Sequence, residues 1–302
     1  MISTFANRPT RRLLAWVAVV TAGASLVAAC GSDSTSAADD VPVEEQLGLE
    51  SAGIIQRQAK AESLIRDCMK TKGFEYVPVD PVAQQADLVG QTGLSDEDFA
   101  AQYGYGLTTL YEQRKRLGGG PNAAYRASLA PTDQAAYDRT LYGDDVSATF
   151  SVALDTGDYS RLGGCTKDAT NAVFGGIDIL QSLQDKLDEL DGRIAADPRM
   201  TDAIAKWSAC MRDAGFDLPE PDQVDVVLLA KLEAIVGPPG NETADYDKAA
   251  LAALQKEEVT MVAADMKCEE QHISPVEEKV RAEYERTFRE ENADLLSKVP
   301  PP

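Results

Sequence analysis

A short motif that occurs twice restricts the folds open to this chain. Residues 68–75 read CMKTKGFE and residues 210–217 read CMRDAGFD. Before each cysteine, apolar residues recur at helical spacing, which predicts an amphipathic helix. The glycine of each copy stands where helices commonly end, because glycine adopts the left-handed conformation at little cost. Prolines follow both copies and prevent the helix from continuing. The motif therefore predicts two helices that end in the same way.

Each copy is followed by one further cysteine, Cys165 after Cys68 and Cys268 after Cys210. Four such cysteines in an exported chain imply two disulfides, for which three pairings are possible. The repeat favours Cys68 with Cys165 and Cys210 with Cys268. The alternative is a four-cysteine zinc site, but the chain has no Cys-x-x-Cys pair and exported proteins meet an oxidising environment. We expect no metal and no cofactor.

The repeat also predicts the overall organisation, a mainly α-helical fold stapled by disulfides and built from two related halves after a disordered tether. We expect a first half at 44–175 with a tyrosine-rich insertion, a connecting helix at 176–200, a second half at 201–275, and a charged C-terminal helix and tail at 276–302. Leucines spaced by three and four residues predict a helix over 167–195, whose buried stripe joins the halves. Further helices are expected at 95–117, 131–142, 222–236, 244–271 and 275–297.

The N-terminus has the pattern of an export signal. Three arginines, Arg8, Arg11 and Arg12, precede an uncharged run of 17 residues from Leu13 to Ala29. This run is shorter than the roughly 20 apolar residues of a membrane-spanning helix, so we interpret residues 1–29 as a cleavable signal peptide. Both the general secretory route and a degenerate twin-arginine signal fit the arginines.

A cysteine follows this run directly. Residues 26–30 read LVAAC and resemble the lipobox of bacterial lipoproteins, in which the cysteine is lipidated and becomes the first residue of the mature protein. An ordinary secretory signal before a free cysteine is the alternative. The next residues are small and polar, so 30–43 is expected to be a flexible tether behind lipidated Cys30. A diacylated, palmitate-type anchor on Cys30 would place the protein on the extracytoplasmic face of the cell membrane.

The charge of the mature chain limits its partners. Residues 1–29 contain three arginines and no acidic residue, so the remaining chain has 26 Lys and Arg against 50 Asp and Glu, a net charge of −24. Such a charge repels nucleic acid phosphates and anionic lipid headgroups. We therefore expect no nucleic acid partner, and contact with the membrane only through the lipid.

The lipobox, the paired Cys-Met-x3-Gly-Phe motifs and the stretch Tyr103-Gly104-Tyr105-Gly106 together resemble a family of uncharacterised lipoproteins that are common in actinobacteria. The resemblance covers about residues 45–275. It implies export and lipid anchoring. It implies no activity and transfers no functional residues.

The catalytic motifs that sequence can reveal are absent. His272 is the only histidine, which excludes metal sites built on two imidazoles, and the chain has no Gly-x-Ser-x-Gly, Ser-x-x-Lys or Walker motif. Two carboxylates are enough for a glycosidase, and 50 acidic residues leave that possibility open.

We therefore expect a lipid-anchored, non-enzymatic binding or interaction module that recognises an envelope protein or a small ligand. Tyrosines combine contact area with a hydrogen-bonding group, so Tyr103, Tyr105 and Tyr111 in the insertion are the candidate ligand-binding residues. The opposing interpretation is that these tyrosines form the core of the insertion. The alternative function is a cell-envelope hydrolase that works through paired carboxylates.

Overall fold

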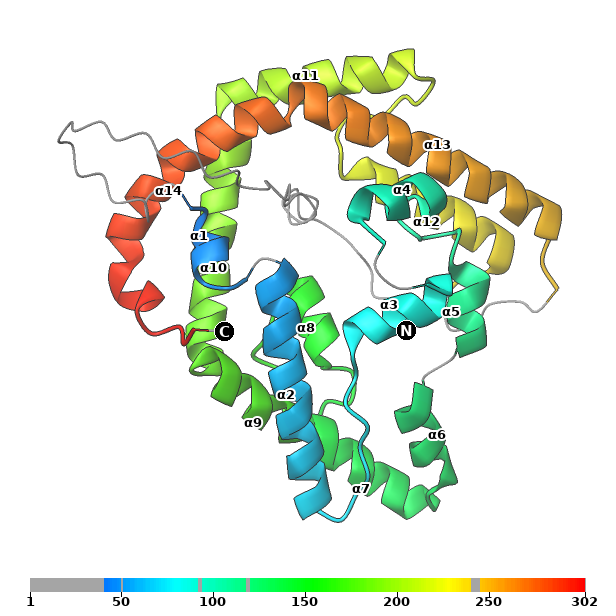
Figure 1. Cartoon of the computed structure of the whole chain (residues 1–302), viewed down its shortest axis with the longest axis vertical. Helices are drawn as coiled ribbons and strands as arrows, with labels where there is room; N and C mark the ends of the chain where they lie inside the picture. Colours follow the sequence, from blue (N-terminus) through cyan, green and yellow to red (C-terminus); the bar gives the residue numbers. More distant parts are fainter. Residues whose placement is uncertain (1–40, 50, 92–93, 118–119, 240–244, 302) are drawn as a thin grey trace, which may run out of the picture.

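The computed structural model describes residues 41–301 except 50, 92–93, 118–119 and 240–244. This part of the chain consists of helices and contains no strand, which confirms the mainly α-helical prediction (Figure 1). The helices are α1 Val43–Gln46, α2 Ser51–Thr71, α3 Pro81–Val89, α4 Asp96–Tyr103, α5 Tyr111–Leu117, α6 Gly120–Ser128, α7 Pro131–Tyr142, α8 Phe150–Thr156, α9 Gly164–Phe174, α10 Ile177–Ala195, α11 Pro198–Asp213, α12 Gln223–Val236, α13 Lys248–His272 and α14 Ser274–Leu296. None of these helices is both long and apolar enough to cross a membrane.

The repeated motif forms the same helix end in both copies. At the end of α2, the Phe74 N–H donates to the Met69 carbonyl at 3.0 Å and the Gly73 N–H to the Lys70 carbonyl at 3.0 Å. The end of α11 repeats these two bonds, between Phe216 and Met211 at 2.9 Å and between Gly215 and Arg212 at 3.0 Å. This is the Schellman pattern, and the glycines adopt the required positive φ of 87° and 97°. The motif is therefore a helix stop that also buries its methionine.

Both predicted disulfides are confirmed. Cys68 at the end of α2 bonds Cys165 at the start of α9, and Cys210 of α11 bonds Cys268 of α13, with Cα–Cα distances of 5.8 and 5.9 Å. The bonds close loops with sequence separations of 97 and 58 residues. Loops of this length correspond to about 4–5 kcal/mol of stabilisation each in the chain-entropy model. Whether the two halves are related beyond the motif stays a prediction.

Two hydrophobic clusters share one helix. The first cluster contains the buried side chains of α2, α7, α8 and α9, and the second those of α11, α12, α13 and α14. Ile177 and Leu180, at the start of α10, lie in the first cluster, whereas Leu183, Leu187 and Leu190 lie in the second. The leucine stripe expected to join the halves therefore belongs to both clusters.

The predicted helix over 167–195 is interrupted at residues 175–176, which separate α9 from α10, and the chain is helical as expected on either side of this break. Gly175 and Gly176 have φ of 81° and 141°, which a helix cannot accommodate. The C-terminal tail passes this break so closely that a Cβ on Gly175 would lie 2.8 Å from the Lys298 carbonyl oxygen. The predicted helix over 95–117 is also broken, at Gly104 and Gly106, which again have positive φ. Apolar spacing alone does not reveal either break.

A buried arginine connects the two ends of the described chain. Arg57 of α2 is 1% exposed and donates to the carbonyl oxygens of Gly48 and Val173 at 3.1 Å, to Pro300 at 2.7 Å and to Leu47. Its guanidinium carbon lies 5.1 Å from the centre of the Phe174 ring. Carbonyls at helix ends carry partial negative charge, so they stabilise the buried cation. One side chain thus joins α1, α2, α9 and the C-terminal tail.

The packed part of the chain, which we call the body, begins before the expected end of the tether at residue 43. Cys30, the signal peptide and most of the tether lie outside the described residues. The tether was expected to extend to residue 43, but Val43 is 1% exposed and packs in the second cluster as the first residue of α1. The packed body therefore includes Val43, because its side chain gains apolar contacts that a tether cannot supply.

Candidate functional site

Helices α10 and α14 pack against each other, and α1 lies beside them (Figure 1). The buried stripe of α10 places Lys186, Glu189 and Arg193, spaced by three and four residues, on one adjoining face. On α14, Val280 and Phe288 are buried. The pair lines an open groove, and outside this groove α14 contacts α1.

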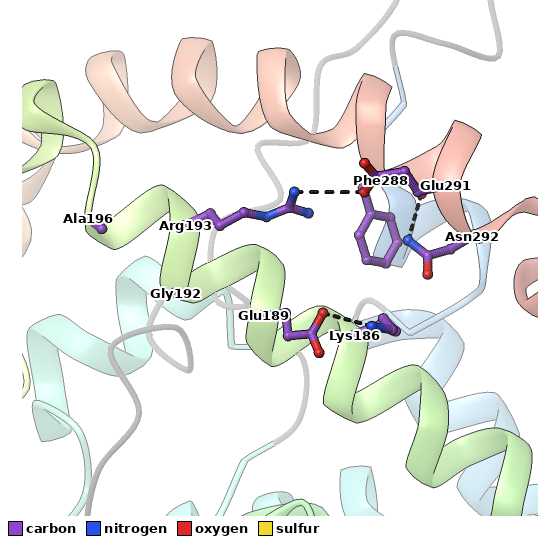
Figure 2. Close-up of a pocket in the computed structure, with 8 residues that line it drawn as sticks. All are labelled: Lys186, Glu189, Gly192, Arg193, Ala196, Phe288, Glu291 and Asn292. Carbon is purple, nitrogen blue, oxygen red and sulfur yellow. Dashed lines mark hydrogen bonds and ion pairs between the residues drawn. The ribbon is translucent and has the colours of Figure 1, made fainter.

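The groove has a volume of about 590 Å³ and is lined by residues of α10 and α14 together with Ala196 (Figure 2). This volume lies within the range of small-molecule sites. Its lining residues are Lys186, Glu189, Gly192, Arg193, Ala196, Phe288, Glu291 and Asn292. Phe288 is fully buried behind this lining, while the charged side chains are exposed.

The groove combines both signs of charge. Lys186 pairs with Glu189 at 2.8 Å, and Arg193 lies 3.8 Å from Glu291 across the groove. Exposed pairs of this kind contribute little to stability, so a ligand can replace them at little energetic expense. A Cβ placed on Gly192 would find no atom within 4 Å, so the α10 backbone is uncovered at this point.

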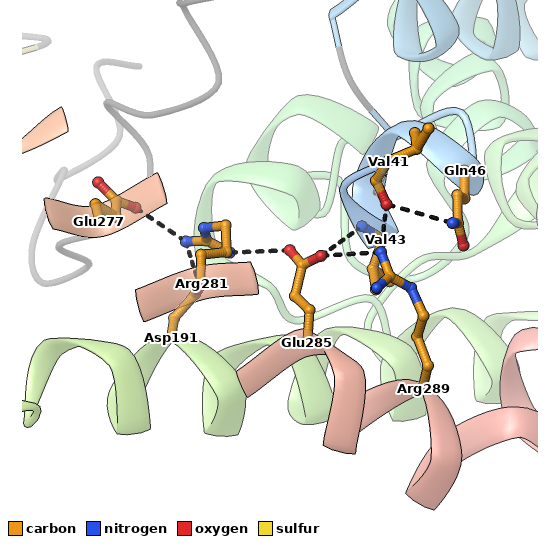
Figure 3. A network of polar contacts seen from close by, with 8 residues as sticks. All are labelled: Val41, Val43, Gln46, Asp191, Glu277, Arg281, Glu285 and Arg289. Atoms are coloured by element: carbon orange, nitrogen blue, oxygen red, sulfur yellow. Dashed lines mark hydrogen bonds and ion pairs between the residues drawn. The ribbon is translucent and has the colours of Figure 1, made fainter. Parts of the chain in front are cut away.

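Outside the groove lining, three carboxylates of α10 and α14 converge on one guanidinium (Figure 3). Arg281 Nη2 lies 3.0 Å from Asp191 Oδ1 and 3.2 Å from Glu277 Oε1, and Arg281 Nη1 lies 3.9 Å from Glu285 Oε1. Arg289 pairs with Glu285 Oε2 at 3.1 Å. Two carboxylate oxygens, Glu277 Oε2 and Glu285 Oε1, are buried without a hydrogen-bond partner among the described residues.

The first turn of the described chain is attached to this cluster. The Val43 N–H donates to Glu285 Oε2 at 3.1 Å, and Arg289 donates to the Val41 carbonyl. Glu44 of α1 interacts electrostatically with Asp191, Glu277, Arg281 and Glu285. We call residues 41–46 the N-terminal clamp, and the four carboxylates with Arg281 and Arg289 the clamp cluster.

Burial disfavours ionised carboxylates in the clamp cluster. Burial is the main cause that raises the pKa of Glu44 to about 7. Arg281 opposes this shift, and the neighbouring carboxylates add to it. Burial also raises the pKa values of Glu277 and Glu285. Arg281 opposes the shift at Glu277, and the hydrogen bond from the Val43 N–H, followed by Arg281, opposes it at Glu285. These groups titrate together as one coupled set.

Of the three candidate tyrosines, one is buried and two are half-buried. Tyr111 is 5% exposed in the second cluster, and its hydroxyl has no hydrogen-bond partner among the described residues. The Tyr105 hydroxyl donates to Asp265 Oδ2 at 2.7 Å, and the Tyr103 hydroxyl donates to the Val89 carbonyl at 3.4 Å. Tyr103 and Tyr105 are only half-buried. The arrangement uses these rings mainly for internal packing and hydrogen bonding.

The loop that carries these tyrosines wraps around a buried carboxylate. Glu258 of α13 accepts hydrogen bonds from the backbone N–H groups of Leu107, Thr108 and Thr109 at 2.8–3.0 Å and from the Thr108 hydroxyl at 2.6 Å. A Cβ on Gly104 would lie 2.8 Å from Glu258 Cγ, which explains the need for glycine at this position. Two turns along α13, Asp265 accepts from Tyr105 and from the Trp207 indole at 3.0 Å. Both carboxylates thus fix the loop to α13.

Sequence reasoning missed Arg57, Glu258, Asp265, the clamp cluster and the groove. A detectable pattern existed for some of them, because Asp191, Glu258, Asp265 and Glu285 occupy core positions within apolar helical stripes. A charge at such a position needs a buried partner. Within the described part of the chain, no group of three or more histidine, cysteine or acidic side chains has an arrangement that could hold a metal ion.

Comparison of the chain with family models, curated proteins and solved structures finds no match. The functional interpretation therefore depends on the geometry of the α10–α14 pair and on the sequence itself.

Replacement of Glu258 with glutamine tests whether this carboxylate holds the tyrosine loop. In the variant, an amide nitrogen, which is a donor, would replace one of the carboxylate oxygens that accept hydrogen bonds from the loop N–H groups. We therefore expect the free energy of unfolding, measured by urea denaturation, to fall by about 3 kcal/mol. The neighbouring Glu257, which pairs with Lys231 at the surface, provides the control. Glu257→Gln should change the free energy by less than about 0.5 kcal/mol. Equal effects of the two variants would contradict the assigned role of Glu258.

Proposed function

We propose that this protein is a lipid-anchored, non-enzymatic binding module on the extracytoplasmic face of the cell membrane, and that its ligand binds in the α10–α14 groove. The groove is the observation that carries the proposal. It combines apolar lining surface, both signs of charge and uncovered backbone within about 590 Å³. These features suit a small ligand, or a protruding segment of an envelope protein, that has both polar and apolar parts.

The proposed lipid anchor rests on the sequence, and it agrees with the position at which the packed body begins. Residues 26–30 resemble a lipobox, and the packed body starts only a short distance later, at the N-terminal clamp. The clamp is bound to α14 through Glu285 and Arg289. A force on a lipid at Cys30 would therefore act first on the helix pair that lines the groove.

The tyrosine stretch supports the binding proposal less than the groove does. Tyr111 is buried, and the hydroxyls of Tyr103 and Tyr105 are engaged within the protein. We therefore place recognition in the groove instead of the tyrosine-rich insertion.

Several observations favour a binding module over the paired-carboxylate hydrolase. Glu258 and Asp265 are fully buried and accept hydrogen bonds from the body itself. The clamp cluster faces two arginines, and none of its four carboxylates lines the groove. The two acidic residues that do line the groove, Glu189 and Glu291, are exposed beside cations, and neither is buried as a general acid commonly is.

Substitution of Cys30 tests the anchor. Cys30→Ala removes the thiol that would carry the lipid, so we expect the protein to remain unprocessed or to leave the membrane fraction, whereas the wild-type protein incorporates labelled palmitate and stays in it. Membrane fractionation with metabolic labelling measures both outcomes. A mature wild-type protein that stays membrane-bound without taking up labelled lipid would refute the anchor.

A photo-crosslinking side chain at position 192 tests the groove. We expect Gly192→p-benzoylphenylalanine to give discrete adducts in living cells, because the added ring projects into the groove. The control places the same side chain at Ala263, an exposed position on α13. Adducts of defined mass at 192 and not at 263 would support the groove. Their absence at 192, or identical adducts at both positions, would overturn it.

A further inference from the structure

The C-terminal tail, residues 297–301, packs back against the body after α14 ends (Figure 1). It crosses the break between α9 and α10, where a Cβ on Gly175 would lie 2.8 Å from the Lys298 carbonyl oxygen and 3.1 Å from Pro300 Cδ. Val299 packs against the second hydrophobic cluster, but Val299 and Pro300 are only half-buried and the other residues of the tail are exposed. The tail therefore has a defined position although it buries little apolar surface.

A hydrogen bond from Arg57 holds the tail. Arg57 Nη2 donates to the Pro300 carbonyl at 2.7 Å, and the same nitrogen donates to the Leu47 carbonyl. Leu47 begins residues 47–49, which lie between the N-terminal clamp and α2 and which we call the linking segment. Each terminal nitrogen of a guanidinium carries two hydrogens. One nitrogen atom therefore binds the tail and the linking segment at the same time.

The other contacts of Arg57 keep this nitrogen in place. Nε donates to the Gly48 carbonyl and Nη1 to the Val173 carbonyl, both at 3.1 Å, and the guanidinium lies over the Phe174 ring. Arg57 is 1% exposed, and an unsatisfied N–H of a buried charged group is energetically expensive. Removal of the tail would leave one N–H of Nη2 unpaired or admit water to the guanidinium. Either change weakens the bonds from Arg57 to the linking segment.

From these bonds we infer that the C-terminal tail is a latch for the linking segment, so that the segment is held while the tail is bound and loosens when the tail is displaced. Arg57 and Val173 belong to α2 and α9, whose buried side chains form the first hydrophobic cluster. The tail and the linking segment are short, and their own apolar side chains are only partly buried. The coupling between them is reciprocal, because any gain that one attachment gives to the other is returned in equal measure.

The latch concerns both regions to which we assign a function, a consequence that rests on the proposed anchor and groove. The linking segment lies on the chain between Cys30 and α2. The tail directly extends α14, whose final turns contribute Glu291 and Asn292 to the groove. Displacement of the tail would therefore loosen the connection to the lipid and one wall of the groove together.

Amide hydrogen exchange on the full-length protein in detergent, compared with a variant that lacks residues 298–302, tests the coupling. The probes are the N–H groups of Leu47, Gly48 and Leu49, which bond carbonyls of the N-terminal clamp. We expect their protection to fall by about tenfold without the tail, as for the loss of one hydrogen bond to a charged group. The helical amides of α7, in the first hydrophobic cluster, should keep their protection. Unchanged probes, or an equal loss in α7, would overturn the inference.

A substitution in the tail provides the matched control. The Lys298 side chain pairs with Asp294 at the surface, at 2.7 Å. Lys298→Gln removes this exposed pair and keeps the tail backbone that reaches Arg57, so protection of the three probes should change by less than about twofold. A loss as large as that of the truncated variant would show that the charge of the tail, and not its bond to Arg57, holds the linking segment.

Arg57→Lys tests whether the coupling passes through the guanidinium. An ammonium cannot reproduce the fork of bonds to four carbonyls, so removal of the tail in this background should lower probe protection by less than about threefold. A further tenfold loss would refute the role of Arg57. Far-UV circular dichroism checks that each variant is folded, and if Arg57→Lys is not, the truncated variant and Lys298→Gln still decide the coupling. Failure of the lipid test with Cys30→Ala would leave these results standing.

Discussion

The packing of α10 is the contact on which the rest of the structure depends. Its first turn lies in one hydrophobic cluster and its remaining turns in the other, so neither cluster is complete without it. The same helix supplies Asp191 to the clamp cluster and Lys186, Glu189 and Arg193 to the groove. Burial of one leucine stripe therefore sets the positions of the charged α10 side chains both in the clamp cluster and in the groove. The two disulfides reinforce the clusters on either side and leave α10 itself without a covalent link.

Buried charges hold the segments that have little apolar surface of their own. Glu258 fixes the glycine-rich turn at 104–109, Arg57 fixes the end of α1 and the C-terminal tail, and Arg281 organises the surroundings of the clamp. Hydrogen bonds to charged groups are stronger than those between neutral groups, and loss of one partner leaves an expensive buried charge. Such contacts give short segments defined positions.

The sequence predicted the parts of the fold that depend on local chemistry. The Schellman ends of α2 and α11 follow from the order of Met, Gly and Phe, and the disulfide pairing follows from the repeat. The breaks at Gly104 and Gly175 were missed because they depend on what packs against each glycine, namely Glu258 in one case and the C-terminal tail in the other. The tyrosines were identified as candidate recognition groups by type alone, and Asp265 is the distant partner that engages Tyr105. The groove could not be predicted, since it depends on how α10 and α14 cross.

If α10 completes both clusters, the described body is one cooperative unit. Differential scanning calorimetry of the oxidised full-length protein tests this most directly. The account predicts a single transition whose calorimetric and van't Hoff enthalpies agree, with a ratio of about 1. Two separable transitions, one for each hydrophobic cluster, would contradict it.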